Sequence, residues 1–261
     1  MNTAAIRLNL APSLPVVSYG PFKLLEAVPW LMFATALRFL ATHWAILAIP
    51  LMAFADYCVL VAFVVGLRRM FVIQQVSKRL NDWTTEEQFQ AAKALFFRLT
   101  LVWMVATFVW FPFATSANWL VFFIGVDGIA FDTYSITSFV KPWCAFNAAL
   151  AFMMLLQKDA GREALLLPAL TELARRAVYM MAAFALLTCF SFGLAYIQEF
   201  VRGHVQIVMA SDAPFPLRNG LFFLFVFSFA SVRLWVNLAV LVFFLRASYS
   251  EENSLKAMSR S

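Results

Sequence analysis

Residues 219–246 read NGLFFLFVFSFASVRLWVNLAVLVFFLR, an apolar run with Arg233 near its centre. A helix needs about 20 apolar residues to cross the roughly 30 Å hydrocarbon core of a bilayer, so this run is long enough to span a membrane. A charge at that depth costs roughly 2.5–3.5 kcal/mol, so Arg233 is expected to have a partner. A second apolar run, 44–67, has Asp56 near its middle. We therefore predict that these two spans touch and that Asp56 and Arg233 meet in the interior.

The composition of the whole chain sets the class of protein. Hydrophobic residues make up 63% of the 261 residues and charged residues only 13%, with 30 Phe. Soluble domains average about 45–50% apolar and about 25% charged residues, so this chain cannot cover a water-facing surface of its size. We predict an all-α, polytopic transmembrane helical bundle. Prolines interrupt residues 1–22, so the N-terminus is not expected to be a removable signal peptide.

The apolar stretch 24–67 is about twice the length of one span, and two interpretations of it stay open. It could form a helical hairpin that turns near 41–43. It could instead form an in-plane amphipathic helix over 28–42, followed by one span over 43–67. The later spans are predicted at 97–117, 138–157, 176–197 and 219–246.

Charge asymmetry favours the hairpin. Basic residues gather in three segments: Arg68, Arg69, Lys78, Arg79 and Lys93; Lys158, Arg162, Arg175 and Arg176; and Arg246, Lys256 and Arg260. Positively charged loops stay on the cytoplasmic side, which places the C-terminus inside. Six spans with both ends inside satisfy every loop, whereas five spans leave Arg7, Lys23 and Arg38 on the wrong side. We predict a multi-pass protein of a bacterial inner membrane.

This topology divides the chain into three parts. Residues 1–23 form a cytoplasmic N-terminal segment, 24–247 a single transmembrane domain, and 248–261 a polar, mobile cytoplasmic tail. A cytoplasmic loop over 68–96 is expected to be helical. Thr84 and Glu87 have the spacing of a capping box, which predicts a helix that starts there and runs into the third span.

The positions of four polar residues along the predicted spans indicate one polar layer in the bundle. Asp56, Asn147 and Arg233 lie near the middles of three spans, and Asn237 lies one helical turn beyond Arg233 on the same face. Such a cluster could bind a polar substrate or pass protons. It could equally be a clamp that fixes how the helices pack.

A second group of candidate residues is the basic cytoplasmic interface, which could hold anionic lipid head groups or an acidic partner: Arg68, Arg69, Lys78, Arg79, Arg175 and Arg176. The net charge of +6 follows from this orientation bias, so no nucleic-acid partner is expected. His43 and His204 lack the further ligands that a metal site needs, so no metal and no cofactor are expected. The three cysteines are too far apart for a disulfide framework and are expected to be buried thiols.

The sequence carries no phosphate-binding loop, metalloprotease motif or nucleophile elbow. Our leading hypothesis is a non-enzymatic subunit or accessory of a larger membrane assembly, with a membrane-protein partner or a second copy of itself. The alternative is a small transporter or channel that uses an intramembrane Asp56–Arg233 layer. A weaker third hypothesis is an enzyme acting on lipids through Asp127 and Asp132.

Overall fold

The computed structural model describes residues 24–74, 82–110, 127–131, 140–211 and 214–258, and these residues fold almost entirely into helices, with no strand among them. In chain order the helices are α1 (Val28–His43), α2 (Ala48–Gln74), α3 (Thr85–Trp110), α4 (Asp127–Ala130), α5 (Val140–Asp159), α6 (Leu166–Arg175), α7 (Ala177–Met209) and α8 (Phe215–Met258). Three helical segments are long and apolar enough to cross a membrane: Ala48–Met70, Ala177–Met209 and Phe215–Ser248. The all-α class and the membrane assignment therefore agree with the sequence analysis.

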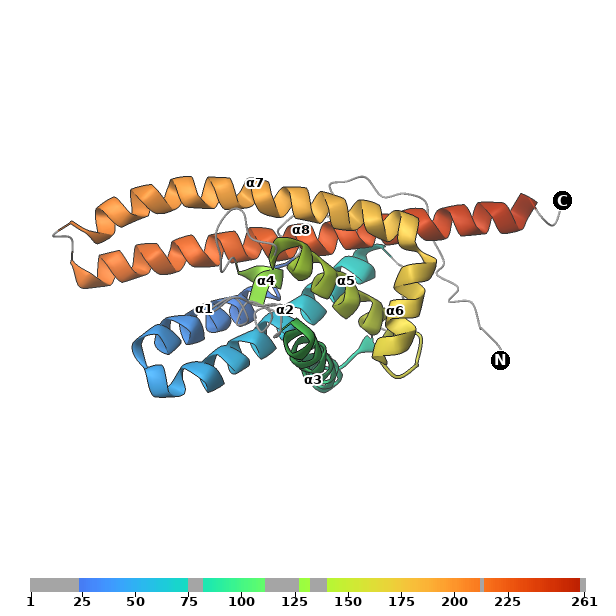
Figure 1. Ribbon diagram of the computed structural model, residues 1–261, viewed down its shortest axis with the longest axis horizontal. Helices are drawn as coiled ribbons and strands as arrows, with labels where there is room; N and C mark the ends of the chain where they lie inside the picture. Colours follow the sequence, from blue (N-terminus) through green and yellow to red (C-terminus); the bar gives the residue numbers. More distant parts are fainter. Residues whose placement is uncertain (1–23, 75–81, 111–126, 132–139, 212–213, 259–261) are drawn as a thin grey trace.

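Two helical hairpins form the frame of the molecule (Figure 1). One pairs α1 with α2 and the other pairs α7 with α8, and both hairpins turn at the same end of the molecule. The turn between α7 and α8 reaches further out than the turn between α1 and α2. The short helix α6 lies toward the opposite end, where the C-terminal part of α8 projects beyond the other helices.

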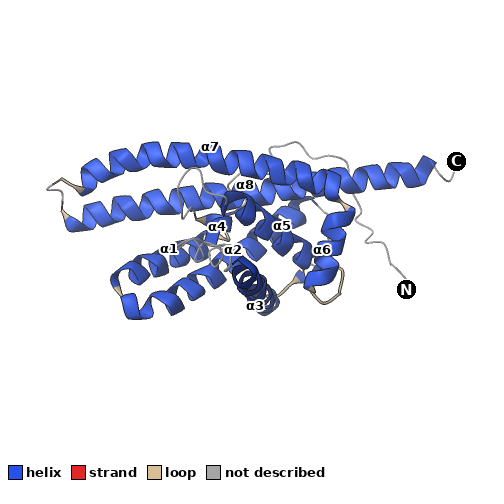
Figure 2. Ribbon diagram, in the orientation of Figure 1, coloured by secondary structure: helices blue, strands red, loops and turns tan. Residues whose placement is uncertain are grey.

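Helix α5 forms the centre of the core. It packs against α3, α4, α6, α7 and α8, and its residues from Ala148 to Leu156 are all buried. An apolar helix that is covered on all sides in this way stabilises the fold through burial rather than through contact with lipid. The view coloured by secondary structure shows that the described elements around it are all helices (Figure 2).

The α1–α2 pair has the hairpin geometry that the charge pattern favoured. The turn consists of Trp44 and a short 3-10 segment, Ala45–Leu47, and so begins just after the expected 41–43. Helix α1 packs along α2, and its bounds are close to the 28–42 of the second interpretation, so whether this stretch forms one span or two stays open. With 16 residues, however, α1 is only about 24 Å long, which is shorter than the roughly 30 Å core of a bilayer.

Helix α3 is oriented differently from the two hairpins. In Figure 1 it is seen nearly end-on, while α7 and α8 lie along the horizontal axis, so α3 crosses their direction. The span expected at 97–117 is helical as far as Trp110, and the residues after it lie outside the described part of the chain. The count of six spans stays a prediction.

One helix end lies where local sequence signals predicted it, and another does not. The capping box is confirmed, because the backbone N–H of Thr84 donates to Glu87 Oε2 at 2.7 Å and the N–H of Glu87 donates to Thr84 Oγ1 at 3.3 Å. The tail expected from residue 248 onward is instead a continuation of α8, which runs unbroken to Met258. That segment contains no Pro or Gly to end a helix, and Glu252 and Lys256 have a spacing that supports one.

Gly66 lets α2 approach α8 closely. A Cβ atom at this position would lie 2.7 Å from Leu238 Cδ1 on α8 and 2.8 Å from Leu24 Cδ2. The absence of a side chain therefore brings the first hairpin into contact with the second.

Candidate functional site

The four residues predicted to form one polar layer are all buried, but the structure gives each of them different neighbours. Asp56 on α2 is 8% exposed, and the charge that acts on it is that of Arg38 on α1 rather than that of Arg233. The physical reason is the α1–α2 hairpin, which packs the two helices together and brings the charge of Arg38 within range of Asp56. Asp56 Oδ1 has no hydrogen-bond partner among the described residues.

Asn147 on α5 joins the core to α3. Its side chain is fully buried, and Oδ1 accepts a hydrogen bond from Trp103 Nε1 at 3.0 Å. Its Nδ2 donates to the carbonyl oxygen of Trp143, one turn earlier in the same helix, at 2.8 Å. Both ends of the buried amide are therefore hydrogen-bonded, and its oxygen connects α3 to α5.

Arg233 and Asn237 on α8 contact two other elements. Arg233 is 3% exposed and donates through Nη2 to Gln198 Oε1 on α7 at 3.4 Å. Asn237 Nδ2 donates to the carbonyl oxygen of Ile129 in α4 at 2.7 Å. Arg233 and Asn237 therefore connect α8 to α7 and to α4, as Asn147 connects α5 to α3.

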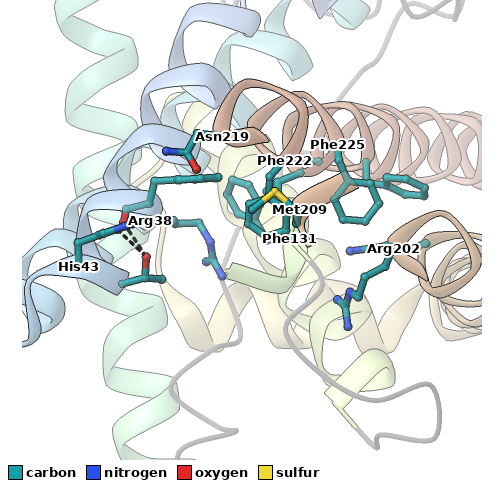
Figure 3. Close-up of a pocket in the computed structure, with 14 residues that line it drawn as sticks. Arg38, His43, Phe131, Arg202, Met209, Asn219, Phe222 and Phe225 are labelled. Carbon is teal, nitrogen blue, oxygen red and sulfur yellow. Dashed lines mark hydrogen bonds between the residues drawn. The ribbon is translucent and has the colours of Figure 1, made fainter. Parts of the chain in front are cut away.

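A cavity of about 390 Å³ lies close to this polar set, between α1, α7 and α8 (Figure 3). Its polar lining comes from Arg38, Thr42 and His43 on α1, from Gln198 and Arg202 on α7, and from Asn219 on α8. The apolar lining is mostly aromatic: Phe39, Phe131, Met209, Phe222, Phe225, Val226, Phe229 and Ala230. The volume is within the usual range of ligand sites, roughly 300–1,000 Å³.

The two arginines of the cavity are held differently. The guanidinium group of Arg38 lies over the ring of Phe131, 4.5 Å from its centroid, and it interacts electrostatically with Asp56. Arg202 Nη1 lies 3.1 Å from Glu199 Oε2 in an ion pair whose side chains are 41% and 55% exposed. Figure 3 shows the two arginines on different sides of the cavity, with Phe131, Met209 and Phe222 between them.

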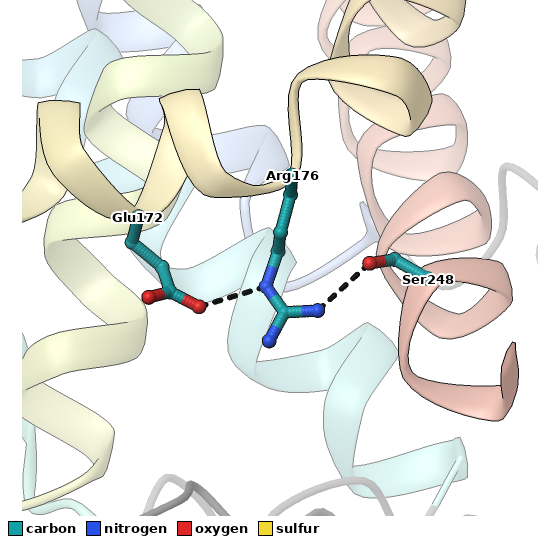
Figure 4. A network of polar contacts seen from close by, with 3 residues as sticks. All are labelled: Glu172, Arg176 and Ser248. Atoms are coloured by element: carbon teal, nitrogen blue, oxygen red, sulfur yellow. Dashed lines mark hydrogen bonds and ion pairs between the residues drawn. The ribbon is translucent and has the colours of Figure 1, made fainter. Parts of the chain in front are cut away.

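At the opposite end of the molecule, Arg176 is part of a buried polar network (Figure 4). It donates through Nε to Glu172 Oε1 at 2.8 Å and through Nη1 to Ser248 Oγ at 2.7 Å. Arg176 is only 8% exposed, so it holds the α6–α7 corner against α8 instead of presenting its charge on the surface.

The other residues of the predicted basic interface are distributed as follows. Arg175 is exposed on the last turn of α6, and Arg68 is partly exposed on α2. Arg69 Nε lies 3.6 Å from Glu26 Oε1 in a solvent-exposed ion pair. Lys78 and Arg79 lie outside the described residues.

No group of three His, Cys, Asp or Glu side chains that could hold a metal is found among the described residues. His43 lines the cavity, and His204 lies on an exposed part of α7 with Nδ1 3.0 Å from the carbonyl oxygen of Phe200. Asp127 begins α4, and Asp132 lies outside the described residues.

The cysteines correct one expectation. Cys58 and Cys144 are buried as predicted, but Cys189 is exposed on α7. Leu187 and Leu194 lie on the buried face of α7. Cys189 lies on the opposite, exposed face of the same helix.

Depth alone did not identify the residues that line the cavity. Arg38 is the only charged residue within α1, a signal that the sequence did contain. Gln198, Arg202 and Asn219 lie toward the ends of long apolar runs, where polar residues are common, and only their convergence in three dimensions distinguishes them. Comparison with protein families, with curated proteins and with solved structures finds no match to this chain.

Proposed function

We propose that the protein is a multi-pass membrane protein, with six spans and both ends cytoplasmic, that works as a non-enzymatic subunit or accessory of a larger membrane assembly. The observation that supports this proposal is a ridge of small residues on the outer face of α7. The ridge consists of Ala185, Cys189 and Gly193, which are spaced four residues apart and are all exposed.

The ridge is shaped to receive another helix. A Cβ atom at Gly193 would meet nothing within 4 Å, so the backbone is open at this point. Small residues at a four-residue spacing let membrane helices approach closely, and such packing is a main source of helix association in lipid. The inner face of α7, which carries Met180, Leu187 and Leu194, is already used by the rest of the chain.

Large apolar residues stand beside the ridge and would pack around a helix docked there. Leu186, Tyr196, Ile197 and Phe200 are 48–72% exposed. Only 28% of the most apolar part of α7 is buried by this chain, compared with 56% for α2. The proposed occupant is a transmembrane helix of another subunit, either a second copy of this chain or a different membrane protein.

The test is affinity purification in mild detergent, with the co-purifying proteins identified by mass spectrometry and their stoichiometry measured. Gly193→Leu should remove the partner, because the new side chain fills the ridge. Gly220→Leu on α8 is the matched control, because a Cβ there also meets nothing within 4 Å, and it should retain the partner. Wild-type protein that purifies alone as a monomer, or equal retention of the partner by both variants, would sink the proposal.

A second candidate function, transport through the bundle, is supported by one observation. Arg38 lines the cavity, and its charge acts on the buried Asp56, so a ligand-sized space is electrostatically linked to a titratable group. Proton flux into liposomes loaded with a pH-sensitive dye should then require Asp56, and Asp56→Asn should abolish it. If the exchanged pair Asp56→Arg with Arg38→Asp restores full function, the two charges form a packing clamp and transport loses its support.

A further inference from the structure

We propose that the cavity between α1, α7 and α8 binds a neutral, single-chain lipid of the monoacylglycerol class. Its glycerol end lies at Thr42, His43 and Asn219, and its hydrocarbon chain lies along the phenylalanines of α8. This inference does not rest on the assembly role, because the α7 ridge and the cavity use different residues.

The cavity is long in one direction and narrow in the others. On α8 its lining runs from Asn219 to Ala230, which is about 16 Å along the helix axis at 1.5 Å per residue. A volume of about 390 Å³ spread over that length gives a mean cross-section of about 24 Å². Such a cross-section is close to that of one extended hydrocarbon chain. The shape therefore favours a ligand with a single chain over a compact solute.

The walls along this length are apolar. Apart from Asn219, every described residue of α8 that lines the cavity is apolar: Phe222, Phe225, Val226, Phe229 and Ala230. Phe39 on α1 contacts this strip from the other side, with its ring centroid 5.2 Å from that of Phe222. Linings that are mostly apolar and aromatic, with a few polar groups, are typical of ligand sites. A hydrocarbon chain can lie along the strip, whereas a free polyol would leave it unused.

The polar residue at the inner end of the strip is already engaged within the protein. Gln198 on α7 is 7% exposed, and its Oε1 accepts a hydrogen bond from Arg233 Nη2 at 3.4 Å. Arg233 lies one helical turn beyond Ala230, so Gln198 lies at the end of the strip that is away from the α7–α8 turn. The polar end of a ligand is therefore assigned to the opposite end.

Three neutral polar side chains lie at that opposite end. Helix α1 ends and α8 begins where both hairpins turn, which places Thr42 and His43 at the level of Asn219. Figure 3 shows His43 and Asn219 on the same side of the cavity. Thr42 Oγ1 donates to the carbonyl oxygen of Phe39 at 2.7 Å and can still accept a bond. The side-chain amide of Asn219 has no hydrogen bond with another described residue, so it can both donate and accept.

This combination of groups matches a glycerol ester. Glycerol hydroxyls both donate and accept hydrogen bonds, and the ester carbonyl accepts them. The amide of Asn219 can therefore bond the carbonyl through Nδ2 and a hydroxyl through Oδ1, while Thr42 accepts from a second hydroxyl. A plain hydrocarbon would leave these groups unused.

The charges of the lining are balanced within the chain, which favours a neutral ligand. Arg38 and Arg202 are the charged residues among the described part of the lining. The charge of Arg38 interacts with that of Asp56, and Arg202 Nη1 lies 3.1 Å from Glu199 Oε2. An anionic head group would add a charge for which this part of the chain has no spare counter-charge, and moving an unbalanced charge out of water is costly.

The surroundings of the cavity point to lipid as the source of the ligand. Thr42 and His43 lead directly into the α1–α2 turn. In and just after that turn, Trp44, Ile46 and Ile49 are 56%, 95% and 83% exposed. Such a cluster is stable in contact with acyl chains, with Trp44 suited to the head-group level. The polar end of the cavity therefore lies next to a surface that lipid would cover.

The experiment is equilibrium binding of radiolabelled 1-oleoylglycerol to the purified, delipidated full-length protein in detergent. Four unlabelled competitors separate the possible ligands: 1-oleoylglycerol itself, the anionic 1-oleoyl-lysophosphatidylglycerol, free glycerol and hexadecane. Unlabelled 1-oleoylglycerol should compete at least about tenfold better than each of the other three. The reason is that it alone combines a neutral polar end with a chain.

Variants on α8 test the site without changing a charge. Val226→Trp fills the strip and should weaken binding by at least about tenfold. Val232→Trp is the matched control, because it makes the same change at a 40% exposed position outside the lining, and it should leave binding unchanged. Asn219→Leu should weaken binding by roughly fivefold through the lost hydrogen bonds, and Asn219→Gln should restore most of it. If Val226→Trp does not fold, the two Asn219 variants decide.

Four results would overturn the proposal. Competition by lysophosphatidylglycerol that equals or exceeds that of 1-oleoylglycerol would mean that the site does not select a neutral lipid. Equal competition by hexadecane would remove the role of the polar end, and displacement by glycerol would make the ligand a free polyol. Full binding by a folded Val226→Trp variant, by Asn219→Leu, or an equal loss in Val232→Trp, would place the lipid outside this cavity.

Discussion

The hydrogen bond between Trp103 on α3 and Asn147 on α5 offers the sharpest test of how the core is held together. Trp103 is 3% exposed and Asn147 is fully buried, so neither side chain can exchange its partner for water. Changing Asn147 to Ala removes the acceptor and leaves the indole N–H without one. A buried donor left unsatisfied costs about 1–3 kcal/mol, and Asn147→Ala should lower the free energy of unfolding by that amount.

The coupling between the two residues is expected to be smaller than the total loss. Interhelical hydrogen bonds in membrane proteins contribute about 0.6 kcal/mol on average and about 1.7 kcal/mol at most. A double-mutant cycle with Trp103→Phe and Asn147→Ala should therefore give a coupling free energy of roughly 0.5–1.7 kcal/mol. Thr188→Val is the matched control, because Thr188 Oγ1 has no hydrogen-bond partner among the described residues, and its loss should cost nothing.

The chain contains its own probe of unfolding. In a Cys189→Ser background the two remaining thiols, Cys58 and Cys144, are buried, so a thiol-reactive dye reports when the core opens during titration with a denaturing detergent. A coupling free energy of zero would refute the reasoning, because it would mean that Trp103 and Asn147 are not bonded in the folded protein. If the Thr188→Val control lost as much stability as Asn147→Ala, the loss would not be specific to this hydrogen bond, and the reasoning would also be refuted.

Three further predictions follow from other parts of the molecule. Thr84→Ala removes the N-cap of α3 and should lower the free energy of unfolding by about 1 kcal/mol, measured in the same titration. Arg176→Ala should destabilise the fold by about 1–3 kcal/mol, because it leaves the buried hydroxyl of Ser248 and the half-buried carboxylate of Glu172 without this donor. Arg175→Ala on the exposed side should be nearly neutral. In protein purified in detergent without a partner, Cys189 should be labelled by a small maleimide while Cys58 stays protected, and equal labelling of the two would mean that the outer face of α7 is assigned incorrectly.

Much of the fold could be predicted from apolar length and local signals. The all-α class, the α1–α2 hairpin and the start of α3 at Thr84 follow from the span lengths, the charge asymmetry and the capping box, each of which acts over a few residues or over composition alone. The continuation of α8 to Met258 could not be predicted from polarity, because a polar segment without Pro or Gly is compatible with both a helix and a flexible tail.

The candidate site was predicted less well, for a reason that lies in helix geometry. Position along a span gives the depth of a side chain, but not the direction in which it points around the helix axis. Asp56, Asn147 and Arg233 share a depth by sequence, yet they lie on α2, α5 and α8 and contact different neighbours. Their burial was correctly expected from the cost of a polar group in lipid, whereas their partners depend on helix rotation.

Arg38 connects the two parts of the site that the sequence analysis kept separate. The charge of its guanidinium group acts on the buried Asp56, and the same side chain lines the cavity. A change at Arg38 is therefore expected to affect both the α1–α2 hairpin and the cavity. Arg202 lines the cavity from the opposite hairpin, in an exposed ion pair with Glu199. Differences between variants at these two positions thus separate the charge of the cavity lining from the charge that acts on Asp56.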